Sequence, residues 1–121
     1  MKCYSTKDRT KLFPIRDAVL GLMPKDGGLA MPLFFPQFGS DFTDSLCNLS
    51  FQEIAFRISR GFFDKESGVS EETLRNVVVD SLSFPIPLVR VCENVHVLEL
   101  FHGPTHAFKD IGARFMSRIL S

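Results

Sequence analysis

One amphipathic segment in the middle of the chain constrains the fold more than any other feature. Ser50 and Glu53 stand in the order of a capping box, in which each side chain can bond the backbone N–H of the other. The apolar residues that follow recur with the period of an α-helix and form one stripe: Phe51, Ile54, Ala55, Ile58 and Phe62. The spacing predicts a helix over residues 50–63 that buries this stripe, with Gly61 weakening its last turn.

A second helix is predicted over residues 71–83. Ser70 precedes it, and two glutamates occupy its first turn, where the helix dipole favours negative charge. Pro85 sets the end of this helix, because proline cannot continue it. Its predicted buried residues are Leu74, Val77 and Val78.

The remaining segments predict shorter elements. Residues 15–22 predict a short helix, and residues 31–35, flanked by proline, predict an extended apolar segment rather than a regular central strand. Residues 95–101, apolar on both faces, predict a strand covered on both sides. A last helix is expected to begin at Asp110 or Lys109 and to continue through Leu120. The chain is therefore expected to be α+β and mainly helical, with a few short strands.

The composition argues against several classes of function. In 121 residues, fourteen Lys and Arg balance fourteen Asp and Glu, so nothing indicates binding to nucleic acid or to an anionic membrane. No run approaches the roughly 20 apolar residues of a membrane span, and the charged N-terminus is unlike a signal peptide. Three widely spaced cysteines, Cys3, Cys47 and Cys92, predict free thiols in a cytoplasmic protein.

The residues with the clearest chemistry lie at positions 101–112, which read FHGPTHAFKDIG. Gly103 and Pro104 start a tight loop, and Lys109 follows at the start of the last predicted helix. A lysine held there by packed neighbours can be desolvated and kept partly neutral, as Schiff-base chemistry with an aldehyde cofactor requires. For an isolated Phe-Lys-Asp, a surface lysine at a helix start would be the preferred interpretation.

The whole stretch resembles the cofactor-lysine segment of threonine synthases, which are pyridoxal-phosphate (PLP) enzymes. Four other segments are similar to the same family: KCYST at 2–6, DAVLG at 17–21, DGGLAMP at 26–32 and LELF at 98–101. The resemblance covers essentially the whole chain and is most specific around Lys109. It implies an α/β fold of the tryptophan-synthase β-chain type for the intact enzyme. Residues 1–93 would then be the N-terminal domain, and residues 94–121 the start of the PLP-binding catalytic domain.

The resemblance also implies a reaction and roles for four residues. The expected reaction converts O-phospho-L-homoserine and water into L-threonine and phosphate. Lys109 is expected to be the catalytic residue, which binds PLP covalently and shuttles protons, and Phe108 to pack beside the cofactor or in the core. Thr105 is expected to face the substrate carboxylate or, equally, only to stabilise the loop. Asp110 is expected to orient Lys109 in the substrate site or, by preference, to cap the following helix.

The glycine-rich loops that hold the PLP phosphate in the family have no counterpart in this sequence, since Gly27-Gly28 reads as a turn. The chain is therefore interpreted as an N-terminal piece of a larger enzyme, inactive and without lysine-specific PLP binding on its own. Apolar residues of the last helix are expected to be uncovered and to favour self-association: Phe115, Met116 and Leu120. Two other functions stay open, a non-catalytic interaction module and another PLP-dependent lyase of the same fold.

Two pairs of side chains suggest binding sites that the pattern does not support. His102 and His106 have the spacing of helical metal ligands, but Pro104 breaks a helix between them, so no metal is expected. His106 also departs from the family pattern, in which an apolar residue is usual at this position. Arg114 and Arg118 could suggest a phosphate site, but a solvated helix face is the preferred interpretation.

Overall fold

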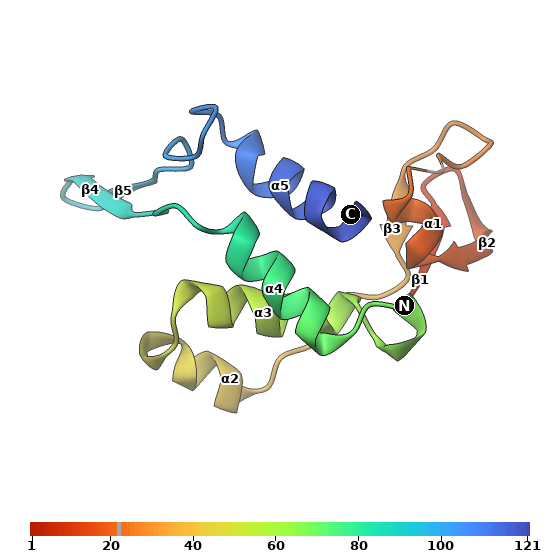
Figure 1. Cartoon of the computed structure of the whole chain (residues 1–121), viewed down its shortest axis with the longest axis horizontal. Helices are drawn as coiled ribbons and strands as arrows, with labels where there is room; N and C mark the ends of the chain where they lie inside the picture. Colours follow the sequence, from red (N-terminus) through yellow and green to blue (C-terminus); the bar gives the residue numbers. More distant parts are fainter. Residues whose placement is uncertain (22) are drawn as a thin grey trace. The chain divides into compact units, whose positions relative to one another are not determined.

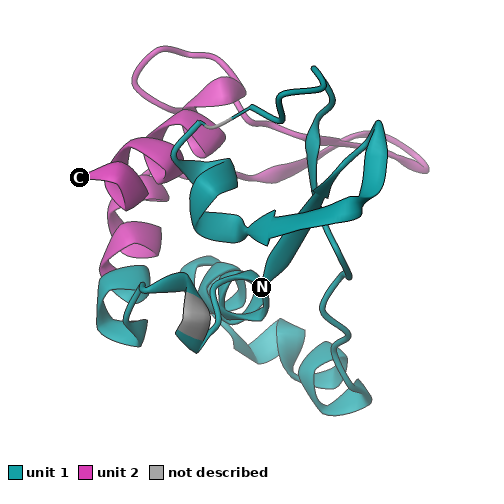
Figure 2. Cartoon of the chain, turned by 90° about the vertical axis from the view of Figure 1, so that its right-hand side faces the viewer, with its two compact units in different colours: residues 1–75 teal, residues 76–121 magenta. Residues whose placement is uncertain are grey.

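The computed structural model describes residues 1–21 and 23–121, and the side chains of these residues except that of Glu66. Residues 1–75 and 76–121 form two compact units, which Figure 2 draws in different colours. Figure 1 labels the helices and strands of both. The longest helices have 12 residues and the longest strand has 7, which agrees with the predicted α+β class. The expected domain boundary after residue 93 stays a prediction.

The first unit begins with a three-stranded antiparallel sheet. Its strands are β1 (Lys2–Ser5), β2 (Asp8–Pro14) and β3 (Ala30–Pro32), in the order β2-β1-β3. As an edge strand, β3 can accommodate Pro32, which has no N–H to donate to a further strand. Burial raises the pKa of the thiol of Cys3, which lies in the central strand.

A glycine turn packs against this sheet. Gly27 has a φ of 72°, which favours glycine. The Asp26 carboxylate accepts a hydrogen bond from the Gly28 N–H at 2.8 Å and from the Ser5 hydroxyl at 2.7 Å. The prediction that Gly27-Gly28 forms a turn is confirmed.

The first helix is shorter than predicted. α1 spans Ile15–Val19, whereas the sequence predicts a helix over residues 15–22. Gly21 has a φ of 75°, a left-handed conformation that cannot continue a right-handed helix. Leu22 lies outside the described residues.

The next helix, α3 (Phe51–Phe62), begins where the capping-box pattern places it. Ser50 Oγ accepts a hydrogen bond from the Glu53 N–H at 3.1 Å. The Glu53 carboxylate itself binds Arg57 Nε at 2.9 Å and Arg75 Nη1 at 2.8 Å. The predicted helix and its N-terminal cap are confirmed.

The second predicted helix is also confirmed as α4 (Glu71–Ser81), which the short 3₁₀ helix η2 (Lys65–Ser67) precedes. Ser70 Oγ accepts a hydrogen bond from the Thr73 N–H at 3.0 Å and caps the helix. The three residues predicted to be buried are 1%, 5% and 1% exposed: Leu74, Val77 and Val78.

The predicted buried stripe of α3 is wrong for two of its five residues, while the other three are half-buried. Phe51 and Ile58 are 45% and 39% exposed, whereas Phe56, which does not belong to the stripe, is only 4% exposed. The Arg75 guanidinium lies 3.9 Å from the centre of the Phe56 ring and covers it. Helical periodicity identifies an apolar face, but a neighbouring element decides which face is covered.

An aromatic segment follows β3 and packs on the end of α3. The rings of Phe35 and Phe62 meet edge to face with their centres 6.4 Å apart. A Cβ atom at Gly61 would lie 2.6 Å from the Pro36 ring, so only glycine permits this approach. The segment then leads into α2 (Ser40–Ser45) and the 3₁₀ helix η1 (Leu46–Asn48).

The second unit contains a β-hairpin of β4 (Leu88–Cys92) and β5 (Val95–Leu98), with Asn94 in its turn at a φ of 116°. The strand predicted over residues 95–101 is confirmed for residues 95–98. The prediction that both of its faces are covered is wrong, because every residue of the two strands is exposed. Apolar character on both faces shows that a strand can be covered, but not that another layer of this chain covers it.

The last helix, α5 (Lys109–Leu120), is attached to the end of α4 by an arginine. Arg114 Nε donates to the Ser81 carbonyl at 3.1 Å, and Nη2 donates to the Asp80 carbonyl at 2.7 Å. These bonds satisfy carbonyls at a helix C-terminus that otherwise lack donors. Arg114 therefore does not lie on a solvated helix face, as the sequence predicted. Arg118 does lie on the solvated face of the helix: it is about half exposed, and its Nε lies 3.7 Å from the Asp80 carboxylate.

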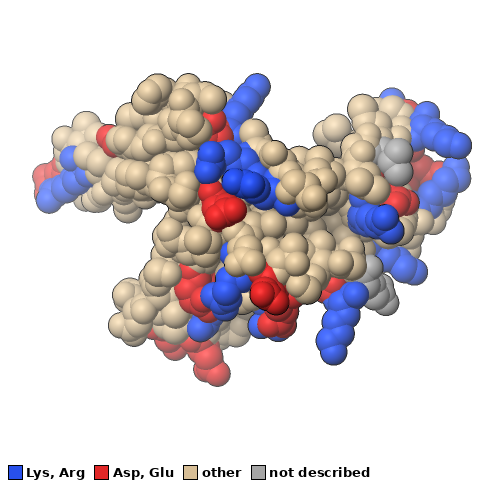
Figure 3. Space-filling model, viewed as in Figure 1, with Lys and Arg blue, Asp and Glu red and all other residues tan. Residues whose placement is uncertain are grey.

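Charges of both signs are interspersed on the face drawn in Figure 3, which agrees with the balanced composition. None of the described helices has the length and apolar character needed to cross a membrane.

Replacing Ser50 with alanine is expected to lower the free energy of unfolding by about 0.5–2 kcal/mol, because the Glu53 N–H loses its acceptor. Urea denaturation followed by circular dichroism measures this difference. Ser50→Asp keeps a side-chain acceptor and is the matched control, which should retain most of the stability. Equal stability of Ser50→Ala and the unchanged chain would contradict the assigned cap.

Candidate active site

The predicted site residues lie in and just after the loop that joins β5 to α5. The Glu99 N–H donates to the Pro87 carbonyl at 3.0 Å and extends the hairpin by one pairing. Helix α5 begins at Lys109, so residues 99–108 form the connection. A hydrogen bond from the His106 N–H to the Gly103 carbonyl, at 3.1 Å, closes a turn inside it.

A buried carboxylate organises this loop. Asp110, the second residue of α5, is 5% exposed. Its Oδ2 accepts a hydrogen bond from the Thr105 N–H at 2.8 Å, and its Oδ1 accepts one from the Thr105 hydroxyl at 2.6 Å. The preference for Asp110 as the N-cap of the helix is wrong, because Phe108 occupies that position and the Asp110 carboxylate binds the preceding loop.

The environment of Asp110 favours its ionised form. The hydrogen bond from the Thr105 hydroxyl is the largest cause that holds the pKa of Asp110 below its ordinary value. Burial opposes this shift, while the N–H groups of Thr105 and Ala107 and the charge of Arg114 add to it. The loop therefore surrounds a negative charge with donors.

Lys109 and Phe108 take no part in this network. Lys109 is exposed, and within residues 1–21 and 23–121 its amine makes no hydrogen bond or ion pair. The Phe108 side chain is 65% exposed, so within the described part of the chain it is not a core residue. An exposed, unpaired amine at a helix start can reach a carbonyl compound and react with it.

The two histidines of the loop make separate local contacts. His102 Nε2 lies 2.6 Å from Glu99 Oε2. His106 adopts a φ of 55°, and its Nδ1 lies 3.3 Å from the Phe101 carbonyl oxygen. Over the described residues, no group of three or more His, Cys, Asp and Glu side chains is placed to hold a metal ion.

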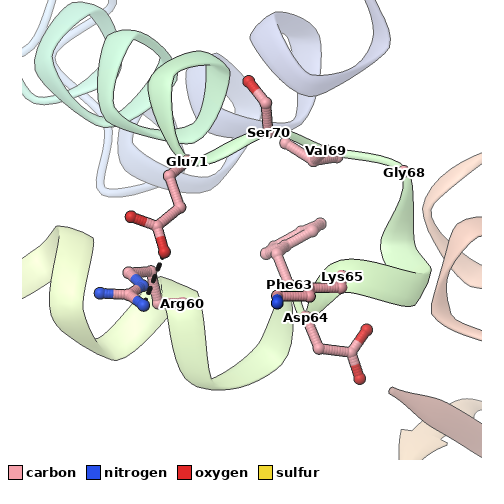
Figure 4. A pocket seen from close by; sticks show the side chains of 8 residues that line it. All are labelled: Arg60, Phe63, Asp64, Lys65, Gly68, Val69, Ser70 and Glu71. Carbon is pink, nitrogen blue, oxygen red and sulfur yellow. Dashed lines mark ion pairs between the residues drawn. The ribbon is translucent and has the colours of Figure 1, made fainter.

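A pocket of about 590 Å³ lies elsewhere, between the end of α3 and the start of α4 (Figure 4). Its lining comes from residues at the end of α3, in the connection and at the start of α4, among them Arg60, Phe63 and Glu71, and none of the predicted site residues contributes. Arg60 and Glu71 pair across it at 2.6 Å, and Asp64 pairs with the Met1 ammonium group. These four charges form two ion pairs, so we assign the pocket no ligand.

The combination of this fold and this lysine loop is the one found in a class of known enzymes, the threonine synthases. The chain belongs to the threonine synthase family, because the family model described as "Threonine synthase N terminus" matches residues 2–82. The family assignment and the expected fold class are thereby confirmed.

Individual relatives match over the whole chain. The threonine synthases of Serratia marcescens and Escherichia coli K12 are 38% and 36% identical to it over 121 residues, which is 100% of this chain. The crystal structure of the E. coli enzyme matches 99% of the chain with a TM-score of 0.91 and 37% identity. The PLP-bound enzyme of Brucella melitensis matches 99% of the chain with a TM-score of 0.88 and 32% identity. The chain spans 28% of the length of the first two relatives and 26% of the Brucella chain.

Sequence reasoning missed two contacts of this site. It did not pair Thr105 with Asp110, although a threonine and an aspartate on either side of a helix start are a common source of such bonds. It also missed Arg114 at the end of α4, although that helix lacks a C-terminal glycine and therefore needs other donors. The first contact is local, between residues five positions apart, whereas the second joins residues 33 positions apart and depends on how the two helices meet.

Lowering the pH is expected to weaken the fold through Asp110. The pKa of Asp110 in the folded chain lies below its ordinary value, so the ionised carboxylate stabilises the fold. This stabilisation is complete at pH values above the ordinary pKa. This contribution disappears as the pH falls through the folded pKa. The stability difference between the unchanged chain and Asp110→Asn should therefore be largest near neutral pH and shrink in acid. Urea denaturation from pH 7 to pH 2 measures it, and a difference independent of pH would contradict the assignment.

Proposed function

We propose that this chain provides the N-terminal part and the cofactor-bearing lysine of a threonine synthase, which converts O-phospho-L-homoserine and water into L-threonine and phosphate. The observation that carries the proposal is the match of the whole chain, including the Lys109 loop, to threonine synthases. The PLP-bound state of the similar Brucella enzyme supports PLP as the cofactor.

The geometry of Lys109 fits covalent attachment of PLP. The lysine is exposed at the first position of α5, and no neighbour in the described part of the chain occupies its amine. When bound, PLP supplies an electron sink for negative charge that develops on the carbon atoms of the substrate. Lys109 Nζ is the group of this chain that would bind the cofactor and carry protons, since its four-carbon stem allows it to move. Exposed Phe108 beside it offers an apolar surface to the cofactor ring.

The roles predicted for Thr105 and Asp110 in substrate binding stay predictions. Their donors and acceptors already bind one another, which supports a role inside the loop more than a direct substrate contact. The three cysteines are free, which supports a reducing compartment such as the cytoplasm.

A hybrid enzyme tests the proposal. In it, this chain replaces the matching N-terminal segment of E. coli threonine synthase, and the gene is placed in a strain that lacks its own threonine synthase. The hybrid should allow growth without threonine, Lys109→Ala should abolish it, and residues 1–121 alone should not restore it. Lys65→Ala, another lysine exposed to solvent, is the matched control and should grow normally. Normal growth of Lys109→Ala would refute the assigned lysine. A folded hybrid that releases no phosphate from O-phospho-L-homoserine would favour a non-catalytic module.

The isolated chain is also expected to associate with itself through exposed apolar residues. Met116 and Leu120 on α5 are 43% and 50% exposed. Sedimentation at micromolar concentration should show species larger than the monomer, and Met116→Gln combined with Leu120→Gln should reduce them. A chain that stays monomeric would rule this out.

A further inference from the structure

We propose that Asp110 is a positioning residue: through its two hydrogen bonds with Thr105, it holds the loop against the first turn of α5 and so fixes the backbone of Lys109. The meaning of this arrangement for catalysis rests on the proposed function, whereas the arrangement itself is a property of this chain. Thr105 and Asp110 then serve the lysine and do not contact the substrate.

The first argument is that both donors of Thr105 are occupied. Its N–H lies 2.8 Å from Asp110 Oδ2, and its hydroxyl lies 2.6 Å from Oδ1. A substrate carboxylate or phosphate would need these same donors. It would also approach the negative charge of Asp110, which repels it. A direct substrate role would therefore require the pair to break.

The second argument is the close approach of the chain to Asp110. At Gly103, an added Cβ atom would lie 2.8 Å from the Cβ of Asp110, a separation that real side chains do not adopt. Only glycine lets the loop pass this close to the carboxylate. The loop also closes on itself, because the His106 N–H binds the Gly103 carbonyl. The carboxylate is thus enclosed by the loop that precedes Lys109.

The third argument is that Lys109 lies between two attached points. On one side, the Asp110 N–H donates to the Ala107 carbonyl at 3.0 Å, and its carboxylate binds Thr105. Further along the helix, Arg114 donates to the Ser81 and Asp80 carbonyls at 3.1 and 2.7 Å. The backbone of Lys109 is held, while its amine stays unpaired in the described part of the chain.

A fixed backbone with a free amine suits a lysine that must bind a cofactor, release it and move protons. Orientation of a reacting group lowers the entropy cost of each step, and rigid support from the surrounding residues maintains that orientation. An ion pair between Lys109 and Asp110 would orient the amine differently, but it would also occupy it. The structure instead directs the Asp110 carboxylate to Thr105.

Nuclear magnetic resonance of the ¹⁵N-labelled 121-residue chain tests the arrangement without any cofactor. In the unchanged chain, the Lys109 amide should be as ordered as that of Ala113 within α5. Asp110→Asn and Thr105→Val should each lower the order of the Lys109 amide and speed hydrogen exchange at the Thr105 amide by about tenfold or more. Thr105→Ser, which keeps the hydroxyl, should restore both values.

The chain offers a matched control. The Thr10 N–H and hydroxyl bind Asp8 at 3.0 and 2.6 Å, the same chemical pair in an exposed strand of the first unit. Thr10→Val should leave the Lys109 amide unchanged. If Thr105→Val and Asp110→Asn also leave it unchanged, the proposal is wrong, whatever the activity of the hybrid enzyme. If Asp110→Asn fails to fold, the result for Thr105→Val decides the test, because this variant keeps the buried carboxylate.

The hybrid enzyme then separates positioning from substrate binding. With Thr105→Val, borohydride trapping and peptide mapping should find less cofactor on Lys109, and kcat should fall while KM stays within about twofold. A raised KM with unchanged kcat would indicate a substrate contact and overturn the positioning role. The two tests can also give different answers. If the hybrid enzyme is inactive but Thr105→Val still lowers the order of the Lys109 amide in the isolated chain, the result counts against the proposed function and supports the positioning role.

Discussion

A buried carboxylate requires hydrogen-bond donors, and the local structure around Lys109 depends on how this requirement is met. Asp110 is nearly inaccessible to solvent, yet its environment favours the charged form. An unpaired charge there would be costly, so the loop must bring donors to it. Thr105 supplies two of them, and Gly103 permits the approach. The course of the loop and the start of α5 follow from this one interaction.

In the first unit, the charged side chain of Arg75 likewise holds two parts of the chain together. Arg75 extends from α4 to the Glu53 carboxylate and covers the Phe56 ring with its guanidinium group. A planar, always-charged side chain can do both at once, which lysine cannot. This contact connects the first turn of α3 to the second turn of α4, and the Met1 ammonium group adds a further ion pair with Asp64.

The sequence predicted those parts of the fold that depend on neighbours along the chain. Ser50 and Ser70 cap their helices, and Val78 is buried where the pattern placed it. Apart from the early end of α1, the errors in the fold concern coverage: Phe51 and Ile58 are exposed while Phe56 is buried, and Val97 in β5 is exposed. Periodicity describes one element at a time, whereas burial depends on the element opposite. The residues of one element do not show which other element will pack against it.

The same division holds at the candidate site. By itself, the sequence determined the family, the position of Lys109 between a loop and a helix, and the glycine that the loop requires. The bond between Thr105 and Asp110 spans only five positions, but the sequence allowed a helix cap there as well, and the structure chose between the two. Only the tertiary structure decided that Arg114 binds the end of α4. Caps and turns arise from bonds between residues a few positions apart, which a sequence displays directly. A bond across 33 positions forms only when folding brings its two ends together, and its partner is then set by packing.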